Sequence, residues 1–104
     1  ERDLAKVRVA PQLFEALVAG YLRGAGAALL AIERDELLFA SQLMTLLLGM
    51  RFLADHLAGD RYFRIRRPGQ NLDLARTQLA LLGDFERQRA ALEAIVAKTA
   101  APLR

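Results

Sequence analysis

Residues 43–60 read LMTLLLGMRFLADHLAGD, and the central helix of the fold is predicted from them. Apolar side chains cover nearly the whole circumference of a helix built from it, and a helix that is apolar all round is expected to lie buried in its fold. Helix-compatible sequence extends back to Leu37, although a break near residues 39–41 is compatible with it. Gly59 is placed to end the helix in a left-handed conformation. The stretch predicts a central, buried helix over residues 37–57.

The flanking sequence predicts two more helices. Pro11 fits a first helical turn, and apolar residues then recur at helical spacing, which predicts a helix over residues 11–28. Asn71 is suited to cap a last, amphipathic helix over residues 72–98. The acids before the central helix suit its N-terminus, where the helix dipole favours negative charge; they are Glu33, Asp35 and Glu36.

The linking segment 61–69 is expected to be irregular or extended, with a turn at Pro68-Gly69. Residues 1–10 read as an incoming segment. The expected fold class is therefore all-α: a small bundle of three to four helices, with residues 1–104 forming a single helical domain. Because the sequence starts at Glu1 rather than methionine, we expect it to be a piece of a larger protein.

Composition narrows the class of protein. The chain has 104 residues, 54% of them apolar, which suits one small domain with a core. It has no cysteine, so a disulfide scaffold, a thiolate zinc site and a cysteine nucleophile are excluded. The longest apolar run ends at Arg51, far short of the roughly 18 to 20 residues of a membrane span. We expect a cytoplasmic protein with no membrane partner.

Motifs for catalysis and cofactor binding are absent from the sequence. The glycines form neither a phosphate-cradling loop nor a dinucleotide fingerprint. His56 is the one histidine and Ser41 the one serine, so neither a zinc site nor a serine nucleophile is supported. We therefore expect no catalytic residue, no metal ligand and no cofactor within these 104 residues.

A more specific signal is the string 43–60 followed by RYFRI at 61–65, RPGQNLD at 67–73 and RTQ at 76–78. This pattern closely resembles the C-terminal region of bacterial N-acetylhexosamine 1-kinase-like proteins, in the aminoglycoside phosphotransferase and choline kinase superfamily. The resemblance is strong over residues 41–80, loose over 4–40, and generic past Gln88.

The resemblance implies a kinase-like parent with a nucleotide-binding lobe and a helical, sugar-binding lobe. Its catalytic and magnesium-holding aspartates would lie upstream of this region. ATP and magnesium are thus implied for the parent, whose partners would be a sugar and the missing N-terminal catalytic region. By itself the chain is expected to be inactive. The alternative is a non-enzymatic helical module that self-associates through an exposed apolar face.

Arg51 and Tyr62 are the candidate substrate-binding residues. The resemblance places the matching arginine in the sugar pocket, and a planar fork of donors suits sugar oxygens. The matching tyrosine approaches the sugar as well. The structural alternatives are an i,i+4 ion pair between Arg51 and Asp55, and a core or rim aromatic at Tyr62 beside Phe63.

Four residues depart from the family pattern. Leu47 replaces a glutamate, so the pocket's polar network and the choice of sugar are expected to differ. The other three are His56 for tyrosine, Arg64 for lysine and Gln70 for histidine.

A basic cluster interleaved with two aromatics also permits a nucleic-acid surface, which we consider the weaker interpretation. Its arginines are Arg61, Arg64, Arg66 and Arg67.

Overall fold

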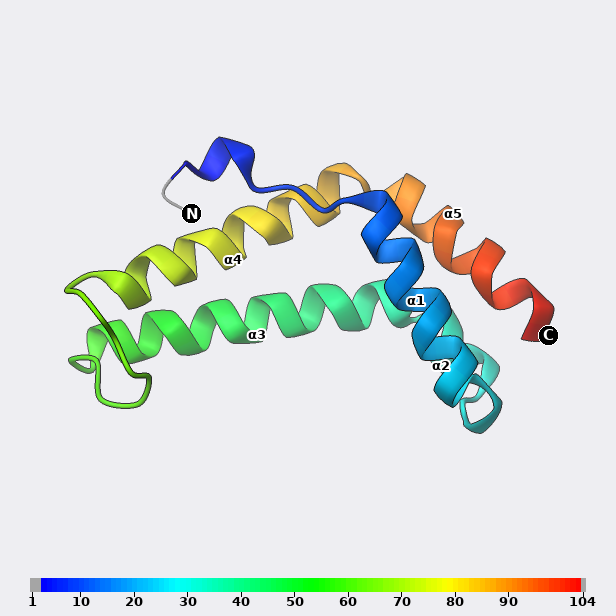
Figure 1. The fold of residues 1–104 in the computed structure, drawn as a ribbon, viewed down its shortest axis with the longest axis horizontal. Helices are drawn as coiled ribbons and strands as arrows, with labels where there is room; N and C mark the ends of the chain where they lie inside the picture. The colour runs from blue at the N-terminus through cyan, green and yellow to red at the C-terminus, as the bar shows by residue number, and fades with distance from the viewer. Residues whose placement is uncertain (1–2, 104) are drawn as a thin grey trace.

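The computed structural model describes residues 3–103, and every regular element within them is helical (Figure 1). The all-α prediction is confirmed. Five α-helices form the fold: α1 (Pro11–Ala25), α2 (Ala31–Asp35), α3 (Leu37–Leu57), α4 (Gln70–Arg87) and α5 (Arg89–Ala100). Three short 3₁₀ turns add to them: η1 (Leu4–Lys6), η2 (Gly26–Ala28) and η3 (Ala101–Leu103).

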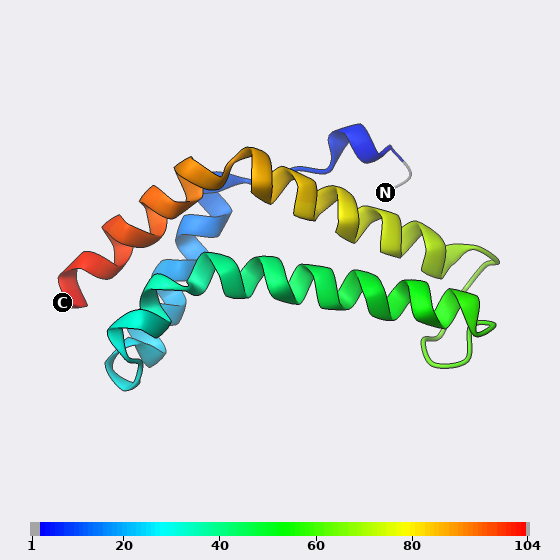
Figure 2. The same cartoon turned by 180° about the vertical axis from the view of Figure 1, so that it is seen from behind.

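The longest helices, α3 and α4, lie side by side and run in opposite directions (Figures 1 and 2). Gly49 allows them to approach closely, because a Cβ atom at this position would lie 3.1 Å from the Cβ of Gln78 on α4. Most of the fully buried positions on these two helices outside the apolar core are small or polar. They include Gln42, Thr45, Gly49, Asn71 and Ala75.

The apolar core lies at the end of the molecule opposite the α3–α4 connection, where α1 and α5 pack together (Figure 1). The rings of Phe14 on α1 and Phe85 on α4 meet edge to face with centroids 6.4 Å apart. Apolar side chains repeat at helical spacing on both α1 and α5, as the sequence predicts. The buried members of this core are Val9, Phe14, Val18, Leu22, Leu38, Phe85, Leu92, Val96 and Ala100.

The segment before α1 is joined to the end of α4 by hydrogen bonds to the buried carboxylate of Asp84. Its Oδ2 accepts hydrogen bonds from the backbone N–H of Val9 (2.6 Å) and from Nε2 of Gln88 (2.6 Å). Gln88 also donates to the carbonyl of Val9 (2.8 Å). Arg87 and Arg8 place positive charge at 3.4 and 4.0 Å from the other carboxylate oxygen. The incoming segment is thus held by polar contacts.

Several boundaries differ from the sequence-based expectation. The helix expected over residues 72–98 is two helices, α4 and α5, which meet at Gln88 (φ −98°, ψ 11°). Asn71 does not cap the helix, because α4 begins one residue earlier and the Asn71 side chain points into a buried hydrogen-bond network. No break occurs near residues 39–41. The end of α3 is as predicted, with Gly59 at φ +92°.

The expectation that the central helix is buried on all sides is wrong. Its buried positions are largely polar or small, whereas Met44 is 65% exposed and Leu47 is 44% exposed. The cause is the elongated shape: the radius of gyration is 15.9 Å, against about 13 Å for a compact domain of 100 residues. Large apolar side chains are exposed on both α1 and α3, and we refer to them together as the apolar face: Leu13, Leu17, Tyr21, Phe39, Leu43, Met44, Leu47, Leu48 and Met50.

By length and composition alone, α3 also qualifies as a membrane-crossing helix, which the search for uninterrupted apolar runs did not indicate. A single such helix is weak evidence for a membrane span, because core helices of soluble proteins meet the same criterion; in this structure, however, only 17% of the apolar window is buried. Along its length α3 packs against α4, a helix carrying charged residues such as Arg76 and Glu86. The packing favours a role for α3 within a helical bundle.

Candidate functional site

Arg51 and Tyr62, the two residues singled out by sequence, lie next to each other. The guanidinium carbon of Arg51 is 5.3 Å from the centroid of the Tyr62 ring and 5.6 Å from that of Phe63. Both distances are within the range of a cation–π interaction. The two rings meet edge to face at 4.9 Å, and Phe63 also contacts Phe52 on α3 at 4.7 Å. Arg51 therefore sits against an aromatic wall.

The wall exists because Asp55 folds the chain back on itself after α3. Its Oδ1 accepts hydrogen bonds from the backbone N–H groups of Arg61 (2.9 Å) and Tyr62 (2.7 Å), and its Oδ2 accepts one from Phe63 (3.0 Å). Nδ2 of Asn71 donates to the same Oδ2 over 2.8 Å. Three consecutive loop N–H groups thus have one acceptor group, which fixes the direction in which the Tyr62 side chain leaves the backbone.

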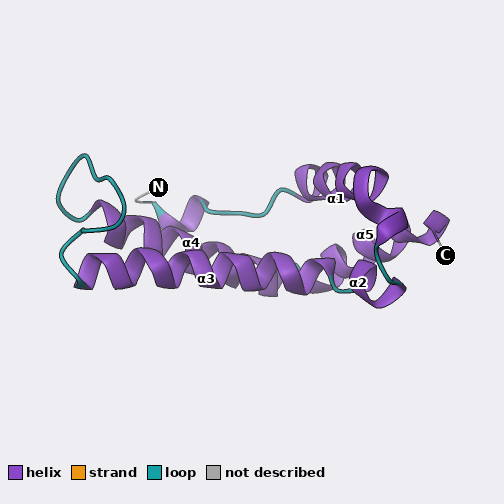
Figure 3. Ribbon diagram, turned by 90° about the horizontal axis from the view of Figure 1, so that it is seen from below, coloured by secondary structure: helices purple, strands orange, loops and turns teal. Residues whose placement is uncertain are grey.

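The turn that begins this loop uses two residues with positive φ, Gly59 at +92° and Asp60 at +60°. Gly59 has no Cβ and adopts this conformation freely, whereas aspartate tolerates it better than most residues. Asn71 donates a second hydrogen bond to Oδ1 of Asp60 (3.0 Å), so it joins the loop at both Asp55 and Asp60. Figure 3 shows this loop projecting to the same side of the α3–α4 layer as α1.

The hydrogen bonds also set the protonation of Asp55. Burial by itself raises the pKa of this carboxyl, but the N–H groups of Phe63, Tyr62, Asn71 and Arg61 outweigh it and hold the pKa below its ordinary value. A carboxylate in the last turn of a helix is otherwise unfavourable, because it lies near the negative end of the dipole. Asp55 is therefore a charged structural group at neutral pH.

A hollow of about 360 Å³ lies in front of the aromatic wall. Ala54 on α3 and Ala58 directly after it contribute small, apolar side chains to its lining. The ion pair between Arg51 and Asp55, the structural alternative for Arg51, is not formed, since the Asp55 carboxylate bonds to the loop instead. Tyr62 is 72% exposed, so it is a rim residue and not part of the core. The residues lining the hollow are Arg51, Ala54, Asp55, Ala58, Tyr62 and Phe63.

The residues that depart from the family pattern lie at or near this end of the molecule. Leu47 is on the exposed side of α3, one turn before Arg51. Arg64 is exposed, and Gln70 accepts a hydrogen bond from the backbone N–H of Arg66 (2.8 Å). Leu47 is not among the residues that line the hollow, although it lies on the same helix one turn before Arg51.

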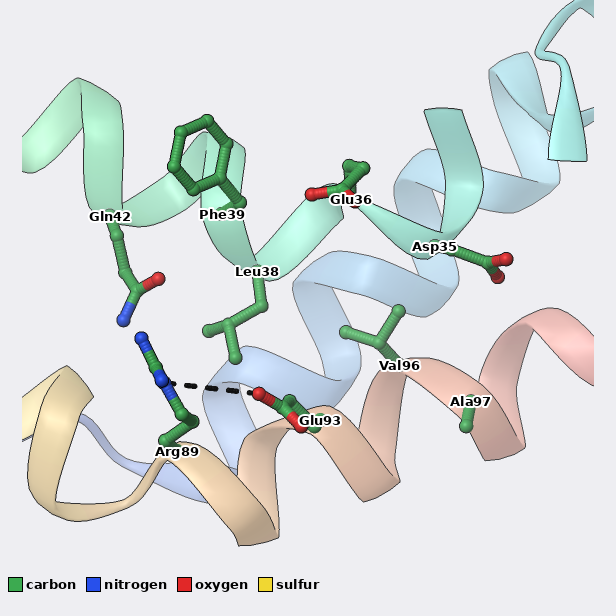
Figure 4. Close-up of a pocket in the computed structure, with 9 residues that line it drawn as sticks. All are labelled: Asp35, Glu36, Leu38, Phe39, Gln42, Arg89, Glu93, Val96 and Ala97. Carbon is green, nitrogen blue, oxygen red and sulfur yellow. Dashed lines mark ion pairs between the residues drawn. The ribbon is translucent and has the colours of Figure 1, made fainter. Parts of the chain in front are cut away.

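Two larger cavities lie elsewhere on the molecule. One, of about 510 Å³, lies between α3 and α5, and Figure 4 shows Arg89 pointing toward Glu93 within it. Arg89 lies 3.9 Å from Glu93 and 3.3 Å from Glu86, so its charge is already paired. The other, of about 500 Å³, is an apolar groove between α1 and α3 that belongs to the apolar face.

Comparison with known families adds no assignment, because no protein-family model matches the sequence. Within residues 3–103, no three His, Asp or Glu side chains are grouped so that they could hold a metal ion.

The roles of Phe63, Asn71 and Asp55 in building the site were not predicted from the sequence, which offered Asp55 as an ion-pair partner of Arg51. One signal could have identified Asp55: an acid in the last turn of a helix opposes the dipole and so calls for local donors. Asn71 gave no such signal, because an asparagine before a helix is usually a cap.

Proposed function

We propose that this chain is the sugar-contacting helical subdomain of a sugar 1-kinase-like phosphotransferase. The proposal rests on the position of Arg51 beside Tyr62. The two residues are eleven positions apart in the chain, and the guanidinium carbon of Arg51 lies 5.3 Å from the centroid of the Tyr62 ring. The resemblance picks out these two residues independently as neighbours of the sugar.

In this proposal Arg51 donates hydrogen bonds to sugar oxygens while the Tyr62 ring packs against a face of the sugar. The planar guanidinium presents five N–H donors, which suits a ligand rich in oxygen. Asp55 does not react; it positions Tyr62 through the loop backbone. Phosphoryl transfer needs a base and a bound metal–nucleotide complex, and we assign both to the parent's catalytic region.

The apolar face supports the proposal from a second direction. A monomeric soluble protein rarely exposes a large contiguous apolar patch unless the patch binds something. In a kinase-like parent this surface would contact the catalytic region. In this proposal the chain is a subdomain that contacts the substrate, and another part of the protein carries out phosphoryl transfer.

The decisive experiment begins with the gene. An upstream reading frame containing a kinase-type catalytic loop is expected, and the protein it encodes should convert a sugar to its 1-phosphate with ATP and magnesium. A panel of neutral, amino and acidic sugars assayed by ³¹P NMR gives the readout. The proposal fails if no such loop is encoded, or if no sugar is phosphorylated above a heat-killed control.

The same apolar face favours a second candidate, a non-enzymatic module that self-associates. Taking roughly 200 Å² for a fully exposed large side chain, the face presents on the order of 900 Å². A standard interface buries about 800 Å² on each partner. Self-association without an upstream catalytic loop would favour this candidate over the kinase subdomain.

A further inference from the structure

In the hollow at Arg51, the carboxylate of Asp55 has no lone pair left to accept a further hydrogen bond. An ionised carboxylate offers about four lone-pair sites. In Asp55 two sites take the N–H groups of Arg61 and Tyr62, and the other two take those of Phe63 and Asn71. A ligand hydroxyl entering the hollow therefore cannot donate to Asp55 without displacing a bond that holds the loop.

Donors, by contrast, remain unused. Within residues 3–103 the Arg51 guanidinium forms neither an ion pair nor a hydrogen bond; it lies against the uncharged rings of Tyr62 and Phe63. Ring faces leave the N–H edge of a guanidinium available to a ligand. The alanines of the lining, Ala54 and Ala58, provide no polar group.

The surrounding segment is strongly positive. Residues 51–67 contain five arginines and two aspartates, so five minus two gives +3, which equals the formal charge of the whole chain. One of these arginines, Arg67, is paired with Asp73 at 2.6 Å. Leu47 adds no negative charge at the position where the resembling family has an acid. A hollow in such a segment attracts anions.

We infer that this hollow binds an oxyanion, a carboxylate or a phosphate carried next to a ring that packs on Tyr62. The guanidinium binds either group through parallel N–H···O bonds. A neutral sugar needs both donors and acceptors for its hydroxyls, whereas an oxyanion only accepts. As a substrate class this means an acidic or phosphorylated sugar. The sugar part of the inference rests on the proposed function; the oxyanion part rests on the side chains alone.

The test is an NMR titration of the ¹⁵N-labelled chain, followed at the backbone N–H of Tyr62 and at Nε–H of Arg51. Four ligands separate the sources of the effect: a hexuronate, a hexose 6-phosphate, inorganic phosphate and a neutral N-acetylhexosamine. We expect the two anionic sugars to bind at least 10-fold more tightly than the neutral sugar, with an affinity that falls as salt is added.

Arg51→Gln should remove this preference, because it keeps a polar side chain and loses the charge. Arg51→Lys should retain part of it, since the charge remains without the planar fork. The matched control is Arg23→Gln, which changes the net charge equally on exposed α1 and should leave binding unchanged. Arg51 lies on the surface, so we expect all three variants to fold; their ¹⁵N spectra check this.

The outcomes distinguish the two claims. A neutral sugar that binds as tightly as a hexuronate, with no loss in Arg51→Gln, overturns the oxyanion site and leaves the proposed function standing. Inorganic phosphate binding as well as either acidic sugar supports the oxyanion site but removes the support for a sugar. Absence of any anion binding at about 10 mM, near the weak end of measurable affinity, overturns the inference.

Discussion

Asn71 donates its side-chain amide to the carboxylate of Asp55 over 2.8 Å, although sixteen residues separate the two in the chain. Asn71 is fully buried, at 0% exposure, and its second hydrogen bond goes to Asp60. This one side chain connects the start of α4 to the end of α3 and to the loop between them. The position of Tyr62 beside Arg51 thus depends on a residue that touches neither of them.

Replacing Asn71 should loosen the whole loop. Asn71→Ala leaves the carboxylates of Asp55 and Asp60 with one donor fewer, and we expect a loss of about 1–3 kcal/mol in the free energy of unfolding. Urea unfolding measures the loss. Thr99→Ala is the matched control, because its hydroxyl bonds only to the Ile95 carbonyl of its own helix. An Asn71 variant as stable as this control would show that the network contributes little.

Acid should destabilise the protein through two carboxylates, Asp55 and Asp84. Burial raises the pKa of each, but hydrogen bonds and, at Asp84, neighbouring arginines outweigh it, so both pKa values lie below the ordinary 3.8. The unfolded chain then binds protons more readily than the folded one. This stabilisation is complete above about pH 5 and is lost as the pH falls through 3.8 toward the folded values.

Unfolding free energies measured between pH 7 and pH 2.5 check this expectation. Asp84→Asn should flatten the acid limb of the curve, because the group that titrates is gone. Glu93→Gln alters an exposed carboxylate whose nearest cation is 3.9 Å away, so its curve should follow that of the unmodified protein. Equal flattening in the two variants would contradict the assignment.

Gly49→Ala tests the close approach of α3 and α4. Alanine is favoured over glycine in a helix by about 0.8–1.0 kcal/mol, but its Cβ would lie 3.1 Å from the Cβ of Gln78. A Cβ atom moves only with its helix backbone, and overpacking of this kind costs about 1–3 kcal/mol. We expect net destabilisation, read as a lower melting temperature.

The control for this substitution is Gly24→Ala on α1, where an added Cβ meets nothing within 4 Å. Here only the helix propensity changes, so the melting temperature should rise. If Gly49→Ala also raised it, the α3–α4 contact would have room that the structure does not show.

The apolar face should make the chain associate. Sedimentation equilibrium at several concentrations should show species larger than the monomer, because burying this face removes apolar side chains from water. Leu47→Glu places a charge within the face and should shift the equilibrium toward monomer. Leu30→Glu changes an equally apolar, 67% exposed residue outside the face and should have no such effect. A chain that stays monomeric and binds no apolar dye would count against an interaction surface here.

In the kinase parent, Arg51→Ala and Tyr62→Ala should raise the KM for the sugar and leave that for ATP nearly unchanged. A loss of about 1–3 kcal/mol corresponds to roughly a 5- to 150-fold change. Melting curves must accompany the kinetics. Since Arg51 forms no ion pair with Asp55, we expect Arg51→Ala to melt close to the unmodified protein. Early melting together with normal sugar binding would assign Arg51 a structural role instead.

The all-helical class, the helix of residues 37–57 and its end at Gly59 could be predicted from the amino-acid sequence alone. These follow from local rules, because apolar spacing and a glycine free to adopt positive φ act within a few residues. The sequence also indicated Arg51 and Tyr62 as a pair, through a resemblance rather than through geometry.

The buried face of α3 could not be predicted from the sequence and is seen only in the packing of the folded chain. Periodicity cannot choose a face on a helix that is apolar all round, and here Gly49 and polar partners on α4 make the choice by close packing. The same holds for Asp55, whose four donors come from residues 61, 62, 63 and 71. The Asn71 donor reaches Asp55 only once α4 has folded back along α3, because contacts between residues distant in sequence depend on the path of the chain.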